Sequence, residues 1–167
     1  RDIADMDAIC HVVRSFEDDS IYHAEGSVDS RRDFEMVNSE LVLHDQIFVE
    51  KRIERLEAMV KKIKDEDQQK ELVLMHKLKD ILEEEKPLRL IELTDDEEKM
   101  IRSYPFITRK KMVIAVNVSE EDLDNEAFLS PFKQSCETLE IEVMLVSAKV
   151  EAEIAMLDTQ EEKDEFL

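Results

Sequence analysis

The chain is poor in the residues that reverse a polypeptide backbone. Its 167 residues include one glycine, Gly26, and three prolines. Few tight turns are therefore available, and long helices are favoured. A phosphate-binding loop needs several closely spaced glycines, because its backbone N–H groups must approach the phosphates. With a single glycine, this chain contains no such loop.

Clusters of metal-binding residues are also missing. The two cysteines, Cys10 and Cys136, lie far apart and form no C-x-x-C pair, and the four histidines are scattered. Structural zinc sites take closely spaced cysteine and histidine ligands, so we expect no metal site. Each cysteine lies in an apolar or amphipathic segment. This predicts two buried thiols and a reducing, cytoplasmic location.

Basic residues are scarce and long apolar runs are absent. Lysine and arginine number 23 against 43 acidic residues, which gives a net charge of −20. An acidic surface repels phosphate backbones, so the chain alone is a poor candidate for binding nucleic acid. No apolar run approaches the roughly 20 residues of a membrane-spanning helix, so we expect no membrane partner.

Three short apolar runs, at residues 8–13, 111–117 and 141–146, have the pattern of buried parallel strands. Helical segments alternate with them, which predicts an α/β fold with a parallel sheet. Thr94 and Glu97 match a capping box that opens a helix to about residue 104. Ser119 is expected to cap a helix, and Pro131 to divide residues 120–139 into two short helices. A last helix is expected at 149–157.

Residues 35–86 have a different pattern, that of two amphipathic helices. A helix is predicted from about Asp33 to Lys64, and a second one before Pro87, separated by the polar run at residues 65–69. We expect the two to pack antiparallel as an inserted coiled-coil arm. Their apolar stripes are Val49, Ile53, Leu56, Met59, Val60 and Ile63, and then Leu72, Met75, Leu78, Ile81 and Leu82.

Two of the predicted strands end in small polar residues. The strand at 111–117 ends in Asn117-Val-Ser-Glu120, and the next one is followed by Ser147-Ala-Lys149. Ligands of open α/β sheets bind at the carboxyl ends of the strands. A carboxamide such as that of Asn117 both donates and accepts hydrogen bonds, as reading a purine edge requires. Ser147 and Ala148 would meet the base through backbone N–H groups and a small side chain.

The first of these loops differs from the one that selects guanine. GTP-binding proteins have Asn-Lys-x-Asp there, and the aspartate accepts two N–H groups of guanine. Val118 and Glu120 replace the lysine and the aspartate, which weakens the preference for guanine and permits adenine. Asn-x-Ser before a helix is also an ordinary turn with an N-cap, and spacing alone leaves both interpretations open.

The sequence resembles the YchF and Obg-like ATPase branch of the Obg-related P-loop NTPases. Residues that match this family occur along the whole chain. They are Asp7-Ala-Ile-Cys-His-Val-Val-Arg-Ser-Phe16, His23-Ala-Glu-Gly-Ser-Val-Asp29, Arg32-Asp33, Val49-Glu-Lys-Arg-Ile-Glu-Arg-Leu56, Asn117-Val-Ser-Glu-Glu-Asp-Leu123 and Ser147-Ala-Lys149.

The resemblance implies a nucleotide site whose base is held by this chain. Asn117, Val118 and Glu120 would form the specificity loop and Ser147 with Ala148 the second loop, while Phe16 would lie near the base. Family members are implied to hydrolyse ATP, and GTP less well. The resemblance also implies contact with the ribosome or RNA through the intact protein.

The resemblance further implies a domain organisation. Residues 1–34 and 87–167 would belong to the nucleotide domain and residues 35–86 to the inserted arm. The P-loop and the Mg²⁺ ligands are expected before residue 1, and a TGS-like domain after Leu167. Without phosphate and Mg²⁺ ligands the chain has no catalytic residue of its own. We therefore expect it to be inactive as an ATPase alone.

Two alternatives remain. In the first, the chain is a protein-interaction module in which the helical hairpin docks a partner, without nucleotide chemistry. In the second, it is a stand-alone structural protein, and no G-x-x-x-x-G-K-[ST] motif would precede Arg1. A parallel sheet with an open edge also predicts dimerisation of the chain.

Overall fold

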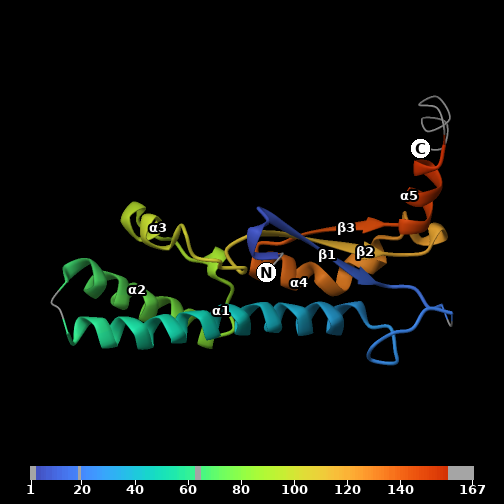
Figure 1. Ribbon diagram of the computed structural model, residues 1–167. Coiled ribbons are helices and arrows are strands. Elements are labelled where there is room, and N and C mark those ends of the chain that lie inside the picture. The colour runs from blue at the N-terminus through green and yellow to red at the C-terminus, as the bar shows by residue number, and fades with distance from the viewer. Residues whose placement is uncertain (1–2, 19, 63–64, 158–167) are drawn as a thin grey trace. The chain divides into compact units, whose positions relative to one another are not determined.

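The computed structural model describes residues 3–18, 20–62 and 65–157 (Figure 1). These residues form two compact units. The helical unit contains the described residues up to Ile9 together with Glu35–Lys111. The sheet unit contains Cys10–Phe34 and the described residues from Met112 onwards.

The sheet has three strands in the order β1-β2-β3. They are β1 (Ala8–Arg14), β2 (Lys111–Asn117) and β3 (Glu142–Val146). β2 and β3 pair in parallel, with Asn117 opposite Val146, and all three arrows run the same way in Figure 1. The predicted α/β fold with a parallel sheet is thereby confirmed.

Short helices accompany the sheet. They are the 3₁₀ helices η3 (Glu120–Asp122) and η4 (Glu126–Phe132), and the α-helices α4 (Lys133–Leu139) and α5 (Ala148–Ala155). Pro131 lies inside η4, where a 3₁₀ helix tolerates it. The boundary between helices that was predicted at this proline lies instead after Phe132, where η4 ends and α4 begins. The buried Phe132 ring meets Phe34 edge to face, with ring centroids 6.0 Å apart.

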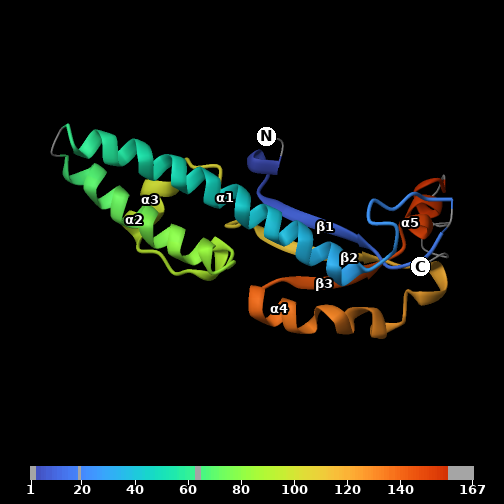
Figure 2. The ribbon, with the colours of Figure 1, turned by 90° about the horizontal axis from the view of Figure 1, so that it is seen from below.

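The helical unit is built on an antiparallel helix pair. α1 (Ser30–Val60) and α2 (Glu66–Glu83) lie side by side in both views of the ribbon (Figures 1 and 2). α1 begins three residues before the predicted start, because the Asp29 carboxylate accepts the N–H of Arg32, 3.0 Å away, as an N-cap does. It ends at Val60, and residues 63–64 of the predicted helix lie outside the described residues.

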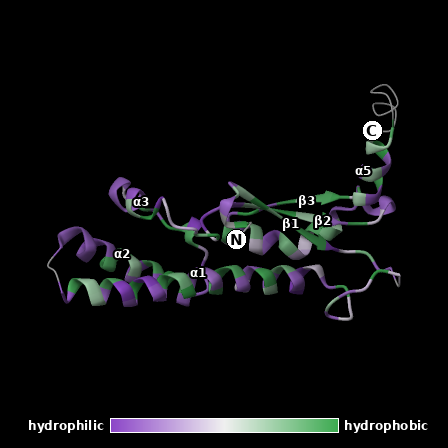
Figure 3. Cartoon of the chain, in the orientation of Figure 1, coloured by the Kyte–Doolittle hydropathy of each residue, from purple (hydrophilic) through white to green (hydrophobic). Residues whose placement is uncertain are grey.

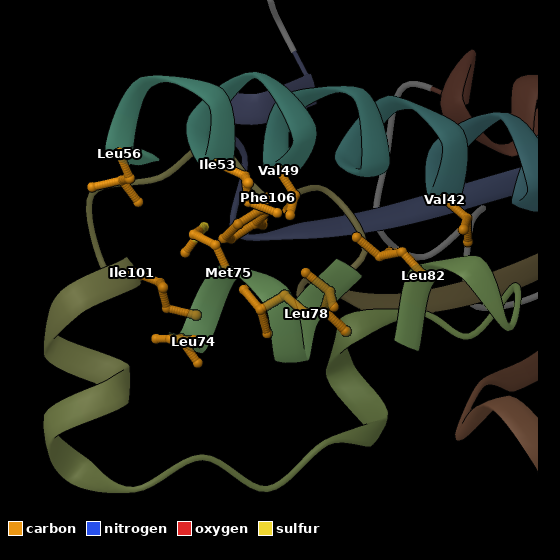
Figure 4. Packing of buried hydrophobic residues seen from close by; sticks show 11 residues of the cluster. Val42, Val49, Ile53, Leu56, Leu74, Met75, Leu78, Leu82, Ile101 and Phe106 are labelled. Atoms are coloured by element: carbon orange, nitrogen blue, oxygen red, sulfur yellow. The ribbon is translucent and has the colours of Figure 1, made fainter. Parts of the chain in front are cut away.

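The core of this unit contains part of the first predicted stripe and most of the second, with Leu72 and Ile81 packed against it. Val49, Ile53 and Leu56 of α1 face α2, whereas Met59 is 43% exposed, so the buried stripe stops at Leu56 (Figure 4). α3 (Asp95–Ile101) completes the core, after the 3₁₀ turn η2 (Leu88–Leu90). Thr94 forms the predicted capping box with Glu97. The core residues are Val42, Val49, Ile53, Leu56, Leu74, Met75, Leu78, Leu82, Leu88, Ile101 and Phe106.

A buried carboxylate ties α1 to the segment that leads into β2. Asp45 is fully buried, and its carboxylate accepts the N–H groups of Ile107 and Thr108 at 3.0 and 2.8 Å. It also accepts the Thr108 hydroxyl at 2.8 Å, and the same hydroxyl oxygen accepts the Leu88 N–H at 3.0 Å. The network satisfies backbone donors that would otherwise be buried without partners.

The hydropathy of the chain follows this plan (Figure 3). The strands are mainly hydrophobic, and α1 and α2 alternate between hydrophobic and hydrophilic residues along their length. No helix among the described residues has the length and apolar character needed to cross a membrane.

The prediction of two buried thiols is wrong, since Cys10 is exposed and Cys136 is half-buried. Cys10 is exposed because β1 exposes every second residue at its start.

Candidate functional site

The carboxyl ends of the three strands are joined by backbone hydrogen bonds. The N–H of Ser15, just after β1, donates to the Asn117 carbonyl over 2.9 Å. The N–H of Val118 donates to the Val146 carbonyl, also over 2.9 Å. The loops that follow the strands therefore begin side by side, as a ligand site at this edge of a parallel sheet requires.

The Asn117 side chain connects two of these loops. Its Oδ1 accepts the N–H of Ala148, the first residue of α5, over 2.9 Å. Only the oxygen of the carboxamide can accept this bond, so the orientation of the amide is set. The Nδ2 group forms no hydrogen bond to the residues that the structure describes, and Asn117 is half-buried. Two N–H donors are thus left for a ligand.

Val118 and Ser147 are packed beneath this edge. Each is 2% exposed, and the Ser147 hydroxyl forms no hydrogen bond within the described part of the chain. Ser147 is the N-cap residue of α5 by position, yet its side chain caps nothing. Ala148 is exposed.

Glu120 extends the site on the side of β2. It is the first residue of η3 and is exposed, and its side-chain carboxylate forms no hydrogen bond or ion pair with a described residue. Ser119 caps η3 only by position, because its hydroxyl donates instead to the Asp122 carboxylate over 2.6 Å. The Glu120 carboxylate is consequently available to a ligand without the loss of an existing bond.

Phe16 follows β1 and is held by Arg14. The Arg14 guanidinium lies 4.9 Å from the centroid of the Phe16 ring, and its Nε donates to the Phe16 carbonyl over 2.9 Å. The half-buried ring lines a hollow of about 450 Å³ with Ser15, Val28 and Pro131. Asn117 and Ser147 do not line that hollow. Phe16 thus lies at the same edge of the sheet as the two loops, but it faces a hollow that Asn117 and Ser147 do not line.

The segment after β1 contains a polar cluster that spacing alone did not identify. His23 Nδ1 accepts the Glu25 N–H at 3.2 Å, so Nε2 carries the proton and donates to Asp33 at 2.9 Å. Arg32 holds the other Asp33 oxygen at 2.7 Å. Nearby, burial lowers the pKa of His11, and the Asp33 carboxylate offsets this only in part. From the sequence, His23, Arg32 and Asp33 were named only as residues that match the family, and their contact was not predicted.

The described residues contain no cluster of side chains that would bind a metal ion. Nowhere among them do three or more histidine, cysteine, aspartate or glutamate side chains gather as a metal site requires.

Comparison with known proteins gives relatives along almost the whole chain. It is 40% identical to a ribosome-binding ATPase YchF of Bacillus subtilis, over 99% of this chain and 45% of that protein. It is 29% identical to an Obg-like ATPase 1 of Caenorhabditis elegans, over 96% of this chain and 41% of that protein. No family model matches the chain.

A solved structure agrees with these sequence matches. The Schizosaccharomyces pombe YchF GTPase aligns with a TM-score of 0.84 and 29% identity, over 97% of this chain and 45% of that one. The chain thus spans less than half the length of these relatives.

Proposed function

This chain belongs to the YchF family of Obg-like ATPases over the region that it spans, and on that premise we propose that the carboxyl edge of its sheet holds the base of a bound nucleotide. The base would lie between the Asn117–Glu120 loop and the loop at Ser147 and Ala148. Phe16 would approach it from the β1 side. A binding site at this edge is what an open parallel sheet favours.

The observation that carries the proposal is the hydrogen bond from Ala148 to Asn117. It holds the two loops together across β2 and β3 before any ligand arrives. The bond uses one lone pair of the carboxamide oxygen and leaves the Nδ2 donors free. A purine offers an acceptor, N7, on the edge that these donors would meet. The site is therefore organised in advance, which reduces the entropy lost on binding.

We propose that the site prefers ATP to GTP. Guanine presents two N–H groups that a short aspartate accepts together, whereas Glu120 places its carboxylate one methylene further from the backbone. Val118 is buried and offers no stem to cover the base, in contrast to the lysine of guanine-selecting loops. Adenine lacks the paired N–H groups and loses nothing by these replacements.

For the intact protein we propose ATP hydrolysis with Mg²⁺, GTP hydrolysis at a lower rate, and association with the ribosome. The relative from Bacillus subtilis is a ribosome-binding ATPase and that from Schizosaccharomyces pombe a GTPase, which supports this. Within this chain a single glycine leaves no phosphate loop, so its part is recognition of the base. Residues 35–86 would be the inserted arm, and 1–34 with 87–167 the nucleotide domain.

The test uses three variants of the full-length gene product. Asn117→Asp retains an acceptor for the Ala148 N–H but loses the Nδ2 donors, and Asn117→Ala loses both. Asn125→Ala is the matched control, because Asn125 also accepts one backbone N–H, that of Ala127, but caps η4 instead. Binding of ATP and GTP is measured by isothermal titration calorimetry.

We expect Asn117→Asp to weaken ATP binding about tenfold, the equivalent of one lost hydrogen bond of about 1.4 kcal/mol. Asn117→Ala is expected to weaken it at least as much, and Asn125→Ala to leave it unchanged. Equal ATP affinity in Asn117→Asp and the unmodified protein would contradict the assignment of Asn117 to the base.

A further inference from the structure

The helical unit has an open hollow that no predicted function uses. It lies between α2 and α3 and has a volume of about 630 Å³. None of the residues that line it belongs to the sheet unit. They are Glu66, Gln69, Lys70, Val73, Leu74, Thr94, Asp96, Glu97 and Met100.

The floor of this groove is apolar. Val73 is 71% exposed although it lies on a helix whose neighbouring residues Leu74 and Met75 are fully buried. Leu74, which lines the groove, packs in the same buried cluster as Ile101 of α3 (Figure 4). Met100 is half-buried at its side. Burial of a side chain such as Val73 by a partner is favourable, because apolar surface leaves water.

The rim of the groove is acidic. Glu66 forms no ion pair with a described residue, and Asp96 pairs at the exposed surface with Lys99 over 3.3 Å. Glu97 pairs with Lys77 over 3.0 Å. Asp65 and Asp67 adjoin Glu66, and α3 carries acids throughout its first turn. Lys70 is the single cation among the described residues that line the groove.

An apolar floor within an acidic rim has a defined complement. We propose that the α2–α3 groove docks a lysine- or arginine-rich protein segment that inserts an aliphatic side chain against Val73 and Met100. Carboxylates at the rim attract the cations of such a segment and speed its association. An amphipathic helix laid into a hydrophobic groove is a recurrent way to bind such segments.

The same charges disfavour the main competing partner. RNA presents a phosphate backbone, which the carboxylates of the rim repel. Unstacked bases need aromatic surfaces or a strongly cationic groove, whereas Lys70 is the one cation and no aromatic residue occurs among the described residues that line this groove. The exposed apolar side chain of Val73 lies on α2 rather than in the polar run between the two helices.

This inference is independent of the nucleotide proposal. The groove contains no residue of the base loops, so loss of peptide binding and loss of ATP binding are separate results. The experiment uses the full-length gene product and three labelled probes. They are a helical leucine/lysine peptide, the same peptide with glutamate in place of lysine, and a single-stranded RNA homopolymer. Fluorescence anisotropy is followed at low and at physiological salt.

Two variants test the groove and two control for it. Val73→Gln removes the apolar floor at an exposed position, and Glu66→Gln with Asp96→Asn removes two charges of the rim. Leu43→Gln changes an aliphatic side chain of α1 that is 53% exposed and does not line the groove. Glu57→Gln removes an exposed charge of the same helix. Circular dichroism verifies that each variant is folded.

We expect the lysine peptide to bind, and its affinity to fall as salt rises. Val73→Gln is expected to weaken it about tenfold, and the double charge variant to weaken it and reduce its salt dependence. The control variants are expected to bind as the unmodified protein does. The proposal fails if Val73→Gln binds unchanged, if Leu43→Gln loses as much affinity, or if the RNA binds more tightly than the lysine peptide.

Discussion

The buried carboxylate of Asp45 gives a sharp prediction about the stability of the helical unit. Replacement by asparagine keeps the shape but turns one accepting oxygen into an NH₂ group. The two backbone donors, of Ile107 and Thr108, then compete for one oxygen. One buried N–H is left facing another donor.

The magnitude follows from the lost bonds. An unsatisfied buried donor costs about 1–3 kcal/mol, and a hydrogen bond to a charged group contributes about 1.5–3 kcal/mol. We therefore expect Asp45→Asn to lower the free energy of unfolding of the helical unit by about 3 kcal/mol. Asp80→Asn is the matched control, because Asp80 is exposed on α2. It is expected to change the stability by less than about 0.5 kcal/mol.

The assay must measure the stability of the helical unit separately, because two compact units need not unfold together. Amide hydrogen exchange is measured by NMR at Ile107 and Thr108. A loss of about 3 kcal/mol corresponds to roughly a hundredfold faster exchange through opening of the unit. If both amides stay as protected in Asp45→Asn as in the unmodified chain, the carboxylate does not hold this segment and the reasoning is refuted.

Two further predictions concern the same unit. Thr94→Ala removes the capping box with Glu97 and is expected to lower the free energy of unfolding by about 1 kcal/mol, measured by urea denaturation. Thr94→Ser retains the cap and is the control. Equal stability of the two variants would contradict the prediction. Burial raises the pKa of Glu71, but hydrogen bonds from Arg52 and Tyr104 outweigh this and leave the pKa below its usual value. The resulting stabilisation is complete above the usual glutamate pKa and is lost as the pH falls through the folded value. We expect Glu71→Gln to reduce the loss of stability on acidification, measured by urea denaturation at several pH values; an unchanged pH profile would contradict it.

Features with a local signature were predictable from the sequence. β2 has the predicted bounds. The apolar residues mark the strand, and the polar Asn117 marks where it ends. The capping box at Thr94 was predictable for the same reason, since its two partners lie three residues apart. The sequence also predicted that the Asn117–Glu120 loop and the loop at Ser147 and Ala148 lie at the same edge of the sheet. The Asn117–Ala148 bond needed the structure.

Features that depend on distant partners were not predictable. Asp45 looks like one more acid of a charged helix, and its partners lie more than sixty residues away, so no spacing reveals them. The exposure of Cys10 was missed because a short apolar run does not show whether one or both faces of its strand are covered. Val73 was overlooked for a related reason: it lies in the apolar run Leu72–Met75, and only packing shows which residue of that run faces outward.

The hydrogen bond from Ala148 to Asn117 also bears on how nucleotide choice changes in evolution. Asn117 supplies the cap that α5 does not receive from its own Ser147, so a substitution there weakens a helix terminus as well as the proposed ligand contact. The Glu120 carboxylate has no partner among the described residues and is free of that double constraint. Under the proposed function, we therefore expect mutations that alter the preferred base to accumulate more readily at Glu120, and Asn117 to stay under selection for folding even in a descendant that has lost its nucleotide.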